Sequence, residues 1–126
     1  MSFLPPDDRR YLTDKGIAYE EVEDGAQKGV ILLNYPLPPG RFDAPAADIL
    51  ILLPSGYPDL PPDMFHTVPW VKLTPDGRHP RAADQPVNFA GRNWQRWSRH
   101  NNEWRAAVDG IWTVLKRIDN ALAVAA

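Results

Sequence analysis

The stretch Tyr57-Pro58-Asp59-Leu60-Pro61-Pro62-Asp63-Met64-Phe65 decides the fold that the sequence predicts. A proline ring fixes φ and removes a backbone donor, so this density of prolines indicates a rigid flap that covers one end of a sheet. Met64 and Phe65 are then expected to turn into the core. The two aspartates of the stretch are expected to be solvated or bonded to nearby backbone.

The residues before this flap predict a short helix and three strands. The helix is expected over 7–13, because proline and acidic residues suit its start and glycine suits its exit. Strands are expected over 17–22, 29–35 and 47–53, and the last of these is an apolar run that predicts the central strand. A fourth strand over 65–73 completes an antiparallel four-stranded sheet.

The residues after the flap divide into an irregular segment and a long helix. Residues 74–102 show no clear period and are expected to be functional or packed tightly on the core. A helix is predicted over 103–124, with an N-cap at Asn101 or Asn102 and with Gly110 in its interior. Its apolar stripe has helical spacing and consists of Trp104, Val108, Ile111, Trp112, Leu115, Ile118 and Leu122. Residues 1–126 are therefore predicted to form a single α+β domain.

The composition limits the chemistry that the chain can perform. Its 126 residues include no cysteine, which excludes disulfides, thiolate metal sites and thiol nucleophiles. The net charge is −2, so nucleic-acid binding is not predicted. No apolar stretch approaches the roughly 18 residues that span a bilayer. The opening residues lack the basic segment of a secretion signal, and we expect a soluble cytoplasmic protein.

A set of residues from the flap and from the segment beyond it resembles the ubiquitin-conjugating enzyme (E2) superfamily. The set consists of Tyr57, Pro58, Pro61, Pro62, Phe65 and Trp104. The resemblance covers about residues 8–122 and implies the ubiquitin-conjugating (UBC/RWD-like) fold. The block from Trp94 to His100 is similar to prokaryotic E2 family E, whose members resemble components of bacterial ubiquitin-like modification operons. That resemblance implies as partners a ubiquitin-like protein, an E1-like activating enzyme of the ThiF type and a JAB-type metallopeptidase, and it implies no cofactor.

The sequence departs from the classical family pattern at the residues that perform catalysis. Arg81 follows a His-Pro pair where the classical family has asparagine, and the chain has no thiol. A thiolate works because the pKa of a free thiol, about 8.5, leaves a usable ionised fraction near neutrality. We therefore expect a non-catalytic component that binds a ubiquitin-like protein, an activating enzyme, or both. Three alternatives stay open: a native cysteine replaced at Ala90 or Ser98, an enzyme that works through Ser98 and His100, and a subunit that uses the fold only for assembly.

The basic and aromatic residues between Arg92 and Arg105 are the candidate binding site. A groove of this composition suits an acidic tail or a C-terminal carboxylate, because arginine pairs with carboxylates bidentately. The alternative is that the tryptophans fill the core while the arginines cap the last helix or lie over the rings. The binding candidates are Trp94, Arg96, Trp97, Arg99 and His100.

The histidines suggest two further kinds of site, and neither is favoured. Ser98 could act as a nucleophile and His100 as its base, and folding could bring Asp109 close enough to orient the histidine. The sequence has no Gly-x-Ser-x-Gly nucleophile elbow, however. A histidine bonded to backbone is the preferred interpretation. The spacing of His66, His79 and His100 matches no zinc-binding pattern, so no metal site is predicted.

Overall fold

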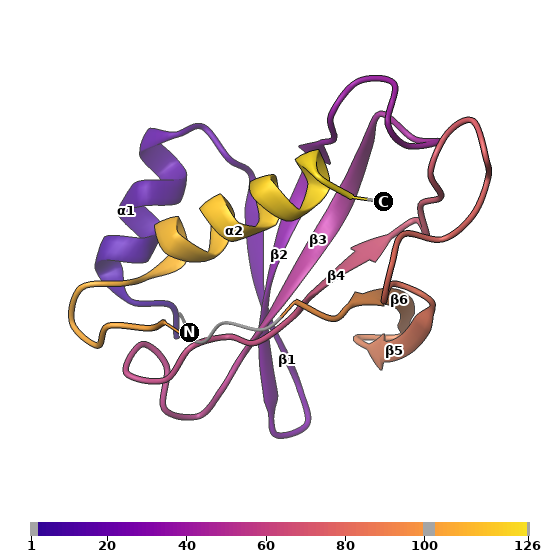
Figure 1. The fold of residues 1–126 in the computed structure, drawn as a ribbon. Coiled ribbons are helices and arrows are strands. Elements are labelled where there is room, and N and C mark those ends of the chain that lie inside the picture. Colours follow the sequence, from indigo (N-terminus) through magenta and orange to yellow (C-terminus); the bar gives the residue numbers. More distant parts are fainter. Residues whose placement is uncertain (1–2, 100–102, 126) are drawn as a thin grey trace.

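The computed structural model describes residues 3–99 and 103–125 (Figure 1). Within these residues the elements are α1 (Pro6–Asp14), β1 (Tyr19–Asp24), β2 (Gln27–Pro36), β3 (Ala46–Leu53), β4 (Phe65–Val68), β5 (Gln85–Phe89), β6 (Arg92–Trp97) and α2 (Ile111–Ala123). All neighbouring strands are antiparallel, in the order β1-β2-β3-β4-β6-β5. The α+β class with a helix near each end is confirmed, but the sheet of the described chain has six strands rather than four.

The segment 74–102, in which no strand was predicted, contains the β5–β6 hairpin. Its two-residue turn is Ala90-Gly91, and both φ angles are positive (52° and 75°), as in a type I′ hairpin turn. Asn-Gly is the usual sequence for that turn, so Ala90-Gly91 is a weak signal. The fourth strand was predicted over 65–73, but β4 ends earlier because Pro69, which has no N–H to donate, follows Val68.

Helix α2 begins at Ile111 rather than at residue 103, so the predicted helix was too long at its N-terminal end. Gly110, expected in the helix interior, is instead extended (φ −161°) and precedes the first turn. The N–H of Ile111 donates to the carboxylate of Asp8, and the N–H of Gly110 lies 3.4 Å from Thr113 Oγ1. These side chains satisfy donors that a helix N-terminus leaves free. The N-cap predicted at residues 101–102 lies outside the described residues.

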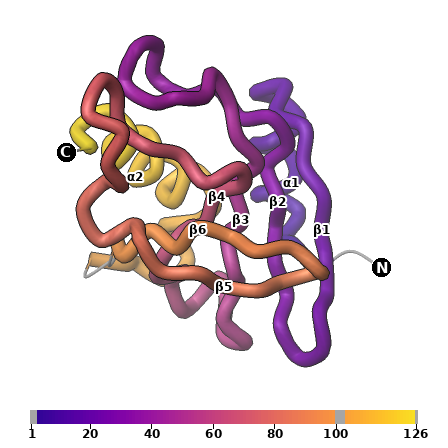
Figure 2. Tube along the Cα trace, turned by 90° about the vertical axis from the view of Figure 1, so that its right-hand side faces the viewer, coloured from indigo at the N-terminus to yellow at the C-terminus, as the bar shows by residue number. Residues whose placement is uncertain are grey.

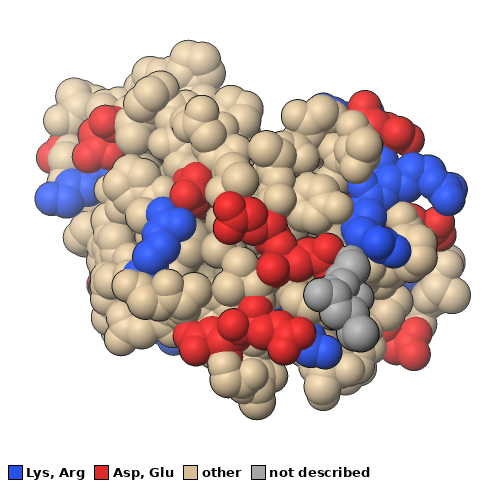
Figure 3. Space-filling model, turned by 180° about the vertical axis from the view of Figure 1, so that it is seen from behind, with Lys and Arg blue, Asp and Glu red and all other residues tan. Residues whose placement is uncertain are grey.

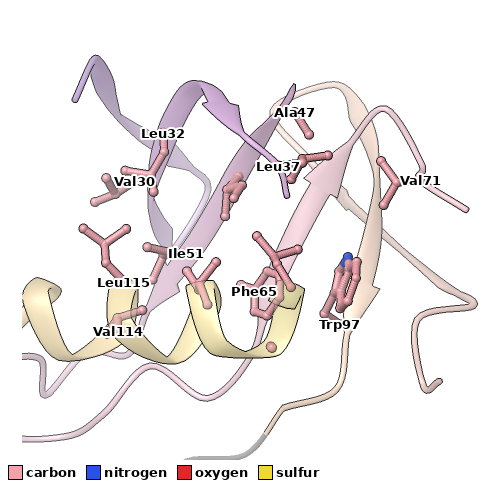
Figure 4. Close-up of a cluster of buried hydrophobic side chains, with 14 of the residues drawn as sticks. Val30, Leu32, Leu37, Ala47, Ile51, Phe65, Val71, Trp97, Val114 and Leu115 are labelled. Carbon is pink, nitrogen blue, oxygen red and sulfur yellow. The ribbon is translucent and has the colours of Figure 1, made fainter. Parts of the chain in front are cut away.

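Both helices lie on one face of the sheet (Figure 1), and the main core fills the space between the helices and the sheet. Strand β3 is third in the sheet order, which confirms that the 47–53 run is a central strand. In Figure 4, Val114 and Leu115 of α2 point toward the sheet, and the Phe65 and Trp97 rings lie beside one another. These two rings stack with centroids 5.1 Å apart. Among the described residues, no helix is both long enough and apolar enough to cross a bilayer.

The β5–β6 hairpin curls across the other face of the sheet toward β1 (Figure 2). At the hairpin turn, the N–H of Ala90 donates to Asp24 Oδ2 at the end of β1 (2.8 Å). Arg92 pairs with Asp48 of β3 across 3.0 Å. A Cβ at Gly29 of β2 would lie 3.0 Å from the Phe89 ring, so the hairpin approaches the sheet closely there. A second apolar cluster forms between the layers and consists of Ile31, Leu50, Phe89 and Trp94.

A buried glutamine on β6 fixes the segment that connects β4 to β5. Gln95 Oε1 accepts hydrogen bonds from Thr67 Oγ1 (2.9 Å) and from the N–H of Val71 (2.8 Å). Gln95 Nε2 donates to the carbonyls of Val71 (3.0 Å) and Ala83 (2.8 Å). The side chain is fully buried, so all of its hydrogen-bonding capacity is used inside the protein. The network holds residues 69–84 against the sheet.

The proline flap is tied to both helices through its tyrosine. The hydroxyl of Tyr57 donates to Asp8 of α1, the carboxylate that also accepts the first N–H of α2. Trp104, predicted to open the last helix, lies outside it and donates from its indole N–H to the carbonyl of Pro58 (2.9 Å). Phe65 is buried in the core below the flap. The flap therefore joins the sheet to the start of α2.

Candidate functional site

The structure buries both tryptophans that were expected to form a binding platform. Trp94 and Trp97 lie on β6 with no exposed surface, and they belong to different apolar clusters on opposite faces of the sheet. Trp94 donates from its indole N–H to the carbonyl of Phe89 (3.1 Å), and Trp97 donates to Thr67 Oγ1 (3.1 Å). The two rings therefore anchor β6 and present no surface to a partner, as the alternative interpretation had it.

Arg96 and Arg99 also lie on opposite faces of the sheet. Alternation along β6 puts Arg96 on the same face as Trp94, where it pairs across the strands with His66. The pKa of His66 is lowered to about 4, chiefly by burial; the hydrogen bond to the Leu50 carbonyl opposes this shift and the nearby Arg96 charge adds to it. His66 is therefore neutral at physiological pH. Arg96 Nε is buried and has no hydrogen-bond partner among the described residues.

Arg99 follows β6 on the side of the sheet that carries α2. Its guanidinium lies over the Trp97 ring at 5.3 Å from the centroid and donates to the carbonyls of Arg81 and Ser98, both at 3.1 Å. Burial lowers the pKa of Arg99, and the charge of Arg81 lowers it further. A half-buried guanidinium beside a second guanidinium is a site that favours an anion.

Two adjoining hollows with volumes of about 240 and 370 Å³ meet at Arg99, beside the C-terminal half of α2. We call them together the cationic groove, since Arg81, Arg99 and Arg117 all line it. The ion pairs between described residues include none of these three arginines. The apolar part of the lining comes from the end of the flap and from α2 with the residue after it, namely Val114, Ile118, Ala121 and Val124. Among the described lining residues, Asp63 is the one acid.

The charge of the molecule is distributed unevenly around this groove. The opposite side, seen from behind in Figure 3, carries acidic side chains across its middle, with most of its Lys and Arg toward the sides. Strand β1 contributes exposed acids at Glu20, Glu23 and Asp24. A net charge of −2 thus hides a local concentration of positive charge around Arg99. An acidic ligand is steered toward that side.

The structure does not assemble the Ser-His-Asp set that the sequence allowed. Ser98 is half-buried and lines the cationic groove, whereas His100 lies outside the described residues. Asp109 lies at the start of α2 and accepts hydrogen bonds from the N–H of Arg105 (2.8 Å) and from Thr113 Oγ1 (3.0 Å). The bond from the Arg105 N–H is the largest cause that lowers the pKa of Asp109. Asp109 therefore makes its hydrogen bonds to residues on either side of the start of α2.

Metal-ligand groups are not assembled by the described part of the chain either. There, no three His, Cys, Asp or Glu side chains are placed together to hold an ion. His66 lies within the sheet, and the His79 ring packs edge-on against Trp70 with centroids 5.7 Å apart. Ala90, one position considered for a replaced cysteine, lies at the exposed tip of the β5–β6 hairpin.

Sequence reasoning missed two of the three arginines in the cationic groove. Arg81 follows the His-Pro pair in a segment without regular structure, which the Gln95 network and a hydrogen bond from the N–H of Ser98 to the Ala82 carbonyl (3.0 Å) bring to β6. Arg117 has a local signal, because helical spacing places residues 117, 121 and 124 on one flank of α2. That signal identifies a helix flank but not the neighbour that faces it.

Comparison with known proteins identifies the family. The sequence model of the family described as "Prokaryotic E2 family E" matches residues 4–125, nearly the whole chain. Searches of curated proteins and of solved structures returned no match. The α+β architecture, with a helix near each end of the described chain and a curled antiparallel sheet, is consistent with the UBC-like fold that this family implies. The chain therefore belongs to prokaryotic E2 family E, as an E2-like protein that has no cysteine.

Proposed function

We propose that this chain is a non-catalytic E2-like component of a bacterial ubiquitin-like modification system. It binds a ubiquitin-like protein, an E1-like activating enzyme of the ThiF type, or both, and it carries no thioester. The observation that carries the proposal is the combination of an E2 family match over residues 4–125 with the absence of any thiol. Ser98 has no acid-oriented base among the described residues, and a serine hydroxyl without one is a poor nucleophile at neutral pH.

The cationic groove is the proposed binding surface. Arg99 is held in place by its stack on Trp97 and by two carbonyl acceptors, so its guanidinium is oriented before a ligand arrives. Pre-ordering a long side chain removes part of the entropy cost of binding. A carboxylate on the ligand offsets the repulsion between Arg99 and Arg81 and gains charge-assisted hydrogen bonds. The groove therefore suits an acidic tail or a C-terminal carboxylate.

The remaining sequence candidates take other roles in this proposal. Trp94 and Trp97 support β6 from its two faces rather than touch the partner. His100 directly follows Arg99 in the sequence and is proposed to extend the same binding surface. Arg96 lies on the opposite face of the strand, so it contributes less than Arg99 to a ligand in the groove.

Affinity measurements on arginine variants test the surface directly. Titration of the ubiquitin-like partner into the chain at about 50 mM salt keeps electrostatic screening weak. Arg99→Ala is expected to weaken binding at least tenfold, since a hydrogen bond to a charged group contributes about 1.5–3 kcal/mol. Arg10→Ala removes the same charge from an exposed pair on α1 and is expected to change affinity less than about twofold. Equal affinities for wild type and an Arg96→Ala, Arg99→Ala double variant would show that the groove is not the binding surface.

A further inference from the structure

A second hollow lies on the other flank of α2 and shares no lining residue with the cationic groove. Its volume is about 1010 Å³, and it is bounded by the end of α1, the α1–β1 connection, the end of β2 and the middle of α2. We call it the aromatic groove. The residues that matter for its chemistry are Tyr11, Lys15, Leu33, Tyr35, Trp112 and Lys116.

Three half-exposed aromatic rings give this groove its apolar surface. The rings of Tyr11 and Trp112 contact each other with centroids 6.0 Å apart and a tilt of 59°. The hydroxyl of Tyr35 donates to Asp119 Oδ1 of α2 at 2.6 Å, which fixes the third ring against the helix. Rigid aromatic side chains lose little entropy when a partner covers them, and they commonly supply the largest energies in protein interfaces.

The charges around the groove are predominantly positive. Lys15 at the end of α1 and Lys116 on α2 are both exposed, and the ion pairs between described residues include neither. The carboxylate that lines the groove belongs to Asp119, and it already accepts the Tyr35 hydroxyl. Two ammonium groups are therefore available to a ligand that carries negative charge.

We propose that the aromatic groove is a docking site for a linear segment of a partner protein in which one large apolar side chain is flanked by Asp or Glu. The apolar side chain packs against Tyr11, Tyr35 and Trp112, and the flanking carboxylates pair with Lys15 and Lys116. A nucleic acid needs more cations than these two, because each phosphate contact requires its own donor. The groove is open to solvent, which suits an extended peptide better than a small molecule that needs an enclosed site.

The test titrates capped synthetic peptides into the whole ¹⁵N-labelled chain and follows the indole N–H signals. The probe has a central phenylalanine flanked by glutamates, and the comparison peptides replace phenylalanine by alanine or the glutamates by lysines. We expect the first peptide alone to shift the Trp112 signal, with a Kd below about 1 mM. A Lys15→Glu, Lys116→Glu double variant should weaken that binding at least tenfold.

Two sets of controls keep this site distinct from the cationic groove. Lys28→Glu with Lys72→Glu makes the same charge change at exposed positions away from the aromatic groove, and it should alter the Kd less than about twofold. Arg99→Ala should leave peptide binding unchanged, so failure of the proposed function does not remove this site. Absence of binding by the acidic phenylalanine peptide, or equal binding by the lysine-flanked one, overturns the proposal. Shifts of Trp112 that appear on concentrating the chain alone would assign the groove to a second copy instead.

Discussion

Replacement of Gln95 by leucine is the perturbation whose effect on stability follows most directly from the structure. Leucine has a similar size, so the change removes hydrogen bonds more than volume. The N–H of Val71 and the carbonyls of Val71 and Ala83 would lose their Gln95 partner in positions without exposed surface, while the Thr67 hydroxyl would keep the indole N–H of Trp97. Each stranded buried group costs about 1–3 kcal/mol. Burial of an apolar leucine offsets about 2 kcal/mol of that cost.

The net expectation is a loss of about 3 kcal/mol in the free energy of unfolding. Urea denaturation followed by tryptophan fluorescence measures it, and for a domain of this size such a loss lowers the midpoint by about 2 M. Hydrogen exchange should show faster exchange at the Val71 amide than in the wild type. Gln85→Leu on the exposed edge strand β5 is the matched control, with an expected change within about 0.5 kcal/mol. A Gln95→Leu protein as stable as the control would refute the role assigned to the network.

Four further substitutions have a predicted effect on the stability of the fold. The pKa of His66 in the folded protein, about 4, lies below the ordinary value of 6.5. The unfolded chain therefore binds a proton first, and about 3 kcal/mol of stability present above pH 6.5 is lost as the pH falls toward 4. The urea midpoint of His66→Gln should accordingly depend less on pH than that of the wild type. Ala90→Asn should raise the free energy of unfolding by about 0.5–1 kcal/mol, because asparagine tolerates the positive φ of the hairpin turn. Ala123→Gly at the end of α2 should lower the free energy of unfolding, because glycine is a poor helix former. Thermal denaturation of both variants beside the wild type measures the two changes. Tyr57→Phe removes the hydroxyl that donates to buried Asp8, whose pKa burial raises, and should destabilise the fold by about 2 kcal/mol. The loss should be larger at pH 7, where Asp8 is ionised, than at pH 4. Equal losses at both pH values would argue against the hydrogen bond.

The first half of the fold could be predicted because local signals and tertiary structure agree there. Proline, glycine and acidic residues delimit α1 and β2, and the apolar run of β3 has the composition of a buried central strand. The flap motif then located the start of β4 at Phe65 correctly, because proline restricts the chain in any context.

The second half of the fold could not be predicted in this way, because β6 is buried on both faces of the sheet. Trp94 and Trp97 are three residues apart, so the alternation of the strand places them on opposite faces, and each fills an apolar cluster on its own side. Trp104 and Val108 extend the apolar stripe of α2 by spacing alone. Trp104 contacts the flap and Val108 is exposed, so neither has a helical role. Apolar residues at helical spacing can therefore lie outside the helix, either against another segment or in solvent.

The candidate site was predictable only as a region. The cluster of arginines and tryptophans identified residues 92–105, and within it Arg99 does line a groove. The separation of Arg96 from Arg99 depends on where β6 ends, which the sequence did not show. The contribution of Arg81 depends on a hydrogen-bonded contact with a segment that has no regular structure.

Intact mass of the chain, recovered from cells that also express the ubiquitin-like protein and the activating enzyme proposed as its partners, tests the central claim most directly. The spectra are compared with and without reductant, for wild type and for Arg99→Ala. The account predicts that the wild-type chain is recovered with its partner at an unshifted mass in both conditions, and that Arg99→Ala loses the partner. A covalent adduct on this chain would contradict it, and the mapped residue, whether Ser98 or another, would become the catalytic nucleophile.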